Sequence, residues 1–144
     1  MKNEKFELNE SSKVLPSGED LGGAKINLNC DMGEGIGSDA LIMPYITSAN
    51  IACGFHAGDV NTMYDTIELA VKHHVLVGAH VSYMDKANFG RTEMNLPQQE
   101  VYELVEQQLI LLKEITDLFN IQLTHVKPHG ALYNQSAKDA ALAK

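Results

Sequence analysis

Apolar and polar positions along the chain follow two alternating patterns, which together predict four strands, each followed by a helix. Short apolar or alternating runs, typical of buried strands, occupy residues 25–30, 48–53, 75–80 and 121–126. Helical spacing of apolar residues predicts helices over 61–74 and from Pro97 to about 119, and a short helix over 39–45 that Pro44 limits. After the fourth strand we expect a loop through Asn134 and a last, alanine-rich helix from about Ser136.

A strand, a loop and a helix repeated four times predict an α/β fold, with a parallel sheet, helices on its faces and right-handed crossovers. A closed (β/α) barrel typically needs about 250 residues, and this chain has 144. We therefore expect about half a barrel, two assembling copies, or a small open sheet. Residues 1–23 are polar and are predicted to form a flexible leader, and residues 24–144 to form the domain.

Charge and composition exclude several classes of function. The net charge is -8, which disfavours nucleic acid and anionic membranes as partners, because both attract basic surfaces. No apolar run approaches 18 residues, and the polar N-terminus is unlike a signal peptide, so we expect a cytoplasmic protein. Cys30 and Cys53 do not make a disulfide framework and are expected to be buried thiols.

Polar groups follow the end of every predicted strand. If the strands are parallel, these ends meet at one rim and the groups converge there. Tyr133 adds a hydrogen-bonding group after the fourth strand. The groups at the four strand ends are Asp31 and Glu34, His56 and Asp59, His80 and Asp85, and Lys127 and His129.

Several of these residues also have a purely structural interpretation. Asp31 and Glu34 are residue types that cap or stabilise a following turn, and Asp59 can cap the next helix. His125 lies within the fourth strand and is interpreted as structural. For Lys127 the functional interpretation is favoured, because burying a lysine at the inner end of a strand costs free energy unless the ammonium is paired or takes part in the chemistry.

The same residues bear on metal and nucleotide chemistry. An aspartate with two histidines at strand ends suits zinc or another divalent ion. The spacing is long-range, and Lys127 at the same rim would repel a cation, so a divalent metal stays an unfavoured alternative. The chain contains neither a GxGxxG nor a GxxxxGK[ST] motif, so it offers no recognisable nucleotide-binding loop of its own.

Four ordered segments resemble the LamB/YcsF family, whose members are also called the A component of 5-oxoprolinase. They are INLNCDMGE at 26–34, SANIACGFHAGD at 48–59, GAHVSY at 78–83 and HVKPHGALYN at 125–134. These ordered motifs are distributed over the chain from Lys25 to the C-terminus, and only the leader lies outside the resemblance. The family pattern has proline where Val81 stands here, and family members are considerably longer.

The resemblance implies a parallel (β/α) barrel of the glycoside hydrolase/deacetylase type, of which this chain holds the N-terminal four units. It implies an enzyme component that opens 5-oxo-L-proline to L-glutamate at the expense of ATP, with two partner subunits handling ATP and activating the lactam. On this basis we predict catalytic roles for Asp31, His56, Lys127 and His129, and substrate contacts for Glu34, Asn50, Asp59, His80 and Tyr133.

This reaction is consistent with the residue types. Phosphorylation of the amide oxygen would make the ring carbon electrophilic, and Asp31, His56 or His129 could then activate water. Lys127 could stabilise developing charge or hold the substrate carboxylate. Two alternatives stay open: a metal-dependent hydrolase acting on amides or N-acetyl groups of carbohydrates, and a truncated chain that self-associates and binds partners without catalysis.

Overall fold

The computed structural model describes residues 26–144, so the predicted leader at 1–23 lies outside the described residues. Four strands form one sheet: β1 (Asn29–Met32), β2 (Ser48–Ala52), β3 (Leu76–His80) and β4 (Leu123–Val126). Between and after them lie the helices α1 (Asp39–Ile42), η1 (Met43–Tyr45), α2 (Val60–Lys72), η2 (Lys86–Asn88), α3 (Gln98–Leu118) and α4 (Gly130–Ser136). The predicted order of strands and helices is confirmed.

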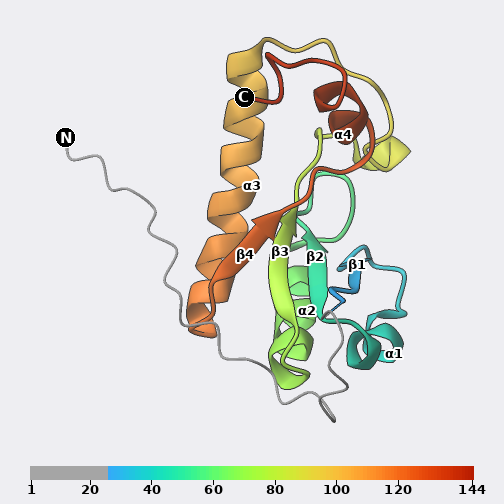
Figure 1. Ribbon diagram of the computed structural model, residues 1–144, viewed down its shortest axis with the longest axis vertical. Coiled ribbons are helices and arrows are strands. Elements are labelled where there is room, and N and C mark those ends of the chain that lie inside the picture. The colour runs from blue at the N-terminus through green and yellow to red at the C-terminus, as the bar shows by residue number, and fades with distance from the viewer. Residues whose placement is uncertain (1–25) are drawn as a thin grey trace, which may run out of the picture.

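All strand pairs are parallel, and the strands follow one another in the order β1-β2-β3-β4. Figure 1 shows the sheet with the long helix α3 beside β4 and α2 behind the central strands. Among the described residues β1 pairs only with β2 and β4 only with β3, so these four strands form an open sheet. This arrangement is consistent with a fragment of a (β/α) barrel, and the four strands do not close a barrel by themselves.

Alternate residues of the central strands divide the sheet into an apolar and a polar face. Ala49, Ile51, Val77 and Ala79 are buried in a core with α2 and α3, which also contact each other. Side chains alternate between faces along a strand, so Asn50 points to the opposite face. The helices therefore cover one face of the sheet and leave polar groups on the other.

The first strand lies later in the chain than predicted. Ile26 and Leu28 are 82% and 54% exposed, whereas Met32 is buried in the core. Residues 29–32 pair in register with residues 48–51 of β2, because this register places Met32 inside. Asp31 is consequently a strand residue and not part of the following loop.

The prediction for the end of the chain was wrong. The last helix begins at Gly130, directly after β4 and its short connection, so Tyr133 and Asn134 are helical; residues 137–144 form turns instead of an alanine-rich helix. Two contacts hold α4 in place: Ala131 donates a backbone hydrogen bond to the Gly90 carbonyl, and Gln135 bonds both backbone groups of Met94. These long-range contacts define the helix, and no local sequence pattern shows them.

Candidate functional site

A row of polar side chains crosses the uncovered face of the sheet. Asp31, Asn50, Gly78 and His125 are register partners on β1, β2, β3 and β4 and therefore share one face. Asn50 Nδ2 donates to Asp31 Oδ1 at 2.8 Å, and His125 Nε2 lies 2.7 Å from Asn50 Oδ1. His125 reaches across β3 because Gly78 has no side chain; a Cβ there would collide with the imidazole ring. A hydrogen-bonded row of side chains thus joins β1, β2 and β4, and it crosses β3 at Gly78.

Asp31 and Lys127 form an ion pair next to this row. Lys127 Nζ lies 2.6 and 2.8 Å from the two carboxylate oxygens, and His80 Nε2 is 3.4 Å from Asp31 Oδ2. Partial burial by itself would raise the pKa of the Asp31 carboxyl, but the adjoining His80, Lys127 and Asn50 side chains hold this pKa well below its ordinary value. Asp31 is therefore ionised, and its charge balances that of Lys127.

Three buried histidines lie at the carboxyl ends of β2, β3 and β4. His56 and His80 are each 1% exposed, and His129 is 9% exposed. The rings of His56 and His129 stack with centroids 4.0 Å apart, and His80 stands edge-on to both. Burial, followed by the charge of His56, lowers the pKa of His129. Such close packing of buried imidazoles is typical of catalytic or metal-binding centres.

Glu34 completes this group from the loop after β1. Its Oε1 lies 3.7 Å from His56 Nε2. Glu34, His56, His80 and His129 each offer one ligand atom, and these four atoms all lie within 4.8 Å of one another. This set differs from the predicted one of an aspartate and two histidines, because Asp31 is paired with Lys127. The same pairing removes the expected objection that the Lys127 charge repels a cation.

Glycine and backbone contacts fix the histidines in place. Gly90 has a positive φ of +65°, and a side chain there would press on His56 and His129. Gln108, fully buried on α3, accepts from Ser82 N and donates to Ser82 O, both at 2.9 Å. Ser82 in turn lies 2.9 Å from His56 Nδ1. The site is thus supported from the core by a chain of polar contacts.

Most of the predicted site residues converge, and three do not. Asp85 accepts hydrogen bonds from Asn88 Nδ2 and Thr92 N within its own loop and is not a member of the cluster. Asp59 Oδ1 accepts from Thr62 N at 2.8 Å and caps α2, so the structural interpretation of this residue holds. Tyr133 lies on α4 and is 54% exposed. The residues that come together are Asp31, Glu34, Asn50, His56, His80, Lys127 and His129.

Sequence reasoning missed the supporting residues. His125, which the strand pattern marks only as structural, contacts Asn50 within the polar row. Gln108 carried a usable signal, because it interrupts the buried stripe of α3 formed by Val101, Leu112 and Ile115. Ser82 and Phe89 had no comparable signal, since their roles depend on loop conformation.

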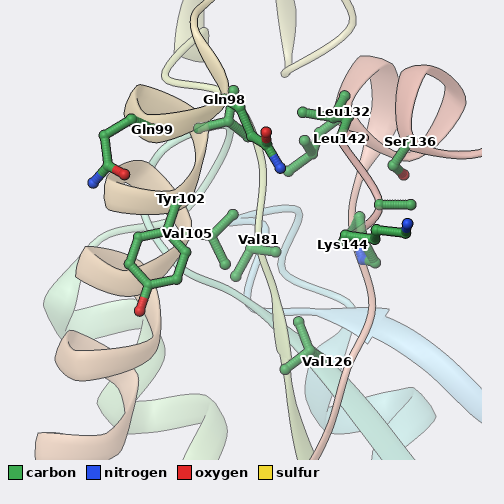
Figure 2. A pocket seen from close by; sticks show the side chains of 13 residues that line it. Val81, Gln98, Gln99, Tyr102, Val105, Val126, Leu132, Ser136, Leu142 and Lys144 are labelled. Atoms are coloured by element: carbon green, nitrogen blue, oxygen red, sulfur yellow. The ribbon is translucent and has the colours of Figure 1, made fainter. Parts of the chain in front are cut away.

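A separate groove of about 720 Å³ lies between α3, the end of β4 and the residues after α4. In Figure 2, Gln98, Tyr102 and Val105 line it from α3, Leu132 and Ser136 from α4, and Val126 from the end of β4. Its lining is mostly apolar and includes none of the polar cluster. The groove is therefore distinct from the candidate site.

Among the helices of residues 26–144, none combines the length and the hydropathy of a membrane span.

A parallel sheet with successive β/α units, and with carboxylate, ammonium and imidazole groups gathered at the carboxyl ends of its strands, defines the class of (β/α) proteins with a site at that rim. Within this class the chain belongs to the LamB/YcsF family, whose model matches residues 26–144.

A solved relative agrees with this assignment. The chain is similar to the crystal structure of lactam utilization protein from Thermus thermophilus, with 42% sequence identity and a TM-score of 0.80. The match covers 83% of this chain and 51% of that chain, so the present sequence corresponds to about half the length of this relative.

Proposed function

We propose that this chain is part of the A component of an ATP-dependent 5-oxoprolinase, which opens 5-oxo-L-proline to L-glutamate together with two partner subunits. Two findings support lactam chemistry: the chain belongs to the LamB/YcsF family, and its solved relative is a lactam utilization protein. The observation that carries the proposal is the Asp31–Lys127 pair beside three buried histidines. ATP is handled with the partner subunits, since the chain has no nucleotide-binding motif of its own.

The residues suit the opening of a five-membered lactam. Amide resonance makes the ring carbon a poor electrophile, and transfer of a phosphoryl group to the amide oxygen would remove that resonance. Lys127 is partly exposed beside Asp31, so its ammonium can meet the substrate carboxylate or the developing oxyanion. Asp31 and the histidines His56 and His129 would direct the water that attacks this carbon; the ring C–N bond then breaks with the nitrogen leaving as the amine, and hydrolysis of the resulting acyl phosphate releases phosphate and L-glutamate. Glu34, Asn50 and His80 surround them and would hold the substrate in place.

A reconstituted assay tests this proposal. The chain is combined with the two partner subunits, 5-oxoproline and ATP, and L-glutamate and ADP are measured; a longer family member serves as the active control. We expect glutamate and ADP in equal amounts, and a loss of at least about 100-fold in Lys127→Ala. Lys113→Ala is the matched control, because Lys113 pairs with Asp117 on the exposed face of α3. Wild-type turnover by Lys127→Ala would remove Lys127 from the mechanism.

The cluster of Glu34 with the three buried histidines supports a second candidate function, a metal-dependent hydrolase of amides or N-acetyl groups. Such an enzyme would release product without ATP, lose activity to a chelator and regain it with zinc. The same assay run without ATP, with and without chelator, separates the two functions. If the longer control is active and this chain gives no product in any arm, the catalytic proposal fails for it, and the chain is then an inactive fragment or a binding component.

A further inference from the structure

In each of the three buried histidines, one ring nitrogen makes a hydrogen bond to a group outside the cluster, and this bond determines which nitrogen carries the proton. His80 Nδ1 lies 2.7 Å from the Lys127 carbonyl, and His129 Nε2 lies 2.9 Å from the Phe89 carbonyl. A carbonyl oxygen only accepts, so each of these nitrogens must carry the hydrogen. In the neutral ring the other nitrogen, His80 Nε2 or His129 Nδ1, is then an unprotonated acceptor.

His56 follows the same rule through Ser82. The Ser82 hydroxyl donates to the Tyr83 carbonyl at 2.8 Å, so its hydrogen is already used. Ser82 Oγ must therefore accept from His56 Nδ1, 2.9 Å away. This leaves His56 Nε2 unprotonated. In the described residues it is also the one buried side-chain nitrogen or oxygen atom that has no hydrogen-bond partner.

Three lone pairs thus face one small space. His80 Nε2 and His129 Nδ1 are 2.9 Å apart, and two acceptors at that distance repel unless something lies between them. His56 Nε2 points into the same group, with the Glu34 carboxylate 3.7 Å away. An unpaired buried polar atom and two opposed acceptors are both costly, and one cation would satisfy all of them.

We infer that the cluster binds one divalent transition-metal ion, with His56 Nε2, His80 Nε2, His129 Nδ1 and the Glu34 carboxylate as its four ligands. Imidazole and carboxylate are the ligands that zinc and its neighbours accept. Metal-binding histidines characteristically donate their second nitrogen to a carbonyl or another acceptor, and all three rings here do so. Ligands at about 2.0–2.1 Å from zinc lie roughly 3.4 Å from each other. The candidate atoms here lie from 2.9 Å to at most 4.8 Å apart, and the stacked rings of His56 and His129 must tilt before both can point a nitrogen at one ion, so metal binding requires these side chains to rearrange.

A proton on His80 Nε2, shared with His129, is the competing explanation. It would convert one acceptor into a donor and satisfy that pair, and the Asp31 carboxylate 3.4 Å away would favour it. It would leave His56 Nε2 without a partner, since Glu34 Oε1 is 3.7 Å away. The metal accounts for all three rings. This inference does not depend on the proposed reaction. It does change the role of His56 and His129, which would then bind an ion instead of accepting a proton from water.

Metal binding by the purified chain tests the site directly. The protein is stripped with a chelator, and Zn²⁺ binding is measured by calorimetry; Co²⁺ is then added and its visible absorption recorded. We expect one equivalent per chain and the intense absorption of four-coordinate Co²⁺, displaced by Zn²⁺. Failure of the folded, stripped chain to bind either ion would overturn the inference and leave the shared proton as the explanation.

Two variants locate the ion. His56→Gln should weaken Zn²⁺ binding by more than about 100-fold, because loss of even an outer-shell partner costs about 10–100-fold. His73→Gln is the matched control, since His73 ends α2 away from the cluster and should bind like wild type. Glu34→Gln provides a second test at a partly exposed loop position, where the fold is least affected; circular dichroism confirms folding. Unchanged affinity in both His56→Gln and Glu34→Gln would exclude this site.

Discussion

Lys127 on the connection after β4 reaches Asp31 on β1, 96 positions earlier in the chain, with Nζ 2.6 and 2.8 Å from the two carboxylate oxygens. Asp31 lies on one outer strand of the sheet, and Lys127 directly follows the other. Neighbouring strands are about 4.8 Å apart, so the outer strands of a flat four-stranded sheet would be about 14 Å apart. Direct contact therefore needs both side chains on one face and a sheet that curves toward that face, as the wall of a (β/α) barrel does.

A double-mutant cycle measures how far this pair holds the outer strands together. Both side chains are about one-third exposed, so we expect a coupling of only about 1 kcal/mol between Asp31→Asn and Lys127→Met in the free energy of unfolding. Denaturant titration of the wild type, both single variants and the double variant gives the coupling. A value within about 0.3 kcal/mol of zero would show that solvent screens the pair completely.

The same pair predicts a pH dependence. The pKa of Asp31 is lower in the folded chain than in the unfolded chain, so its contribution to stability is present above the unfolded carboxyl pKa and is lost as the pH falls through the folded value. The stability difference between wild type and Asp31→Asn should therefore be constant from pH 7 to about pH 4 and shrink below that. A difference that grows on acidification would contradict the assigned direction.

Gly78→Ala should disrupt the polar row although it adds only one methyl group. The Cβ would occupy the space of the His125 ring, which must then leave Asn50. Overpacking in a buried site typically costs about 1–3 kcal/mol, and Asn50 Oδ1 loses its contact with His125 as well. Thermal unfolding and the ring resonances of His125 by NMR report the two effects. The same substitution in a His125→Ala background, where the ring that the new Cβ would meet is gone, separates this clash from the general cost of replacing a glycine.

The two cysteines should differ in reactivity. Burial raises the pKa of the Cys53 thiol to about 12, and Cys53 is fully buried, whereas Cys30 is partly exposed. At pH 8 a thiol reagent should label Cys30 alone in the native chain, and both residues in denaturant. A thiol pKa raised on folding means that stability is lost as the pH rises from about 9 toward 12, at about 1.4 kcal/mol per pH unit. Rapid native labelling of Cys30→Ser would contradict the burial of Cys53.

The order of elements could be predicted because each central strand and each long helix has its own apolar pattern. Residues 77–80 form an unbroken buried run, and the stripe on α3 repeats at helical spacing. The boundaries of the first strand and of the last helix were harder to predict. β1 is located by pairing with β2, and α4 by bonds to Gly90 and Met94, so tertiary contacts decide both. Their local sequences do not determine where they begin.

The convergence of the site was predictable for a similar reason. Parallel strands bring their carboxyl ends to one rim, and this rule alone grouped Asp31, His56, Lys127 and His129. The rule does not say which way a side chain turns once the strand has ended. Asp59 consequently became a helix cap, and Glu34 joined the histidines while Asp31 paired with Lys127. Which of the two carboxylates lies with the histidines is therefore decided by the loop conformation in the folded chain.

Gln108 shows how the core supports this set. Its amide bonds both backbone groups of Ser82, the residue that accepts from His56 Nδ1. Gln108→Leu would leave a buried N–H and a buried C=O without partners, so we expect a loss of about 2–4 kcal/mol in the free energy of unfolding.

Gln99→Leu is the control for this change, because Gln99 is exposed on the same helix and bonds only Glu103; it should stay within about 0.5 kcal/mol of wild type. Denaturant unfolding of both variants, with Zn²⁺ titration of the folded fraction, gives two readouts. If Ser82 positions His56, then Gln108→Leu should also weaken metal binding about 10–100-fold. Reduced stability with unchanged Zn²⁺ affinity would show that Gln108 supports the fold without positioning the histidine.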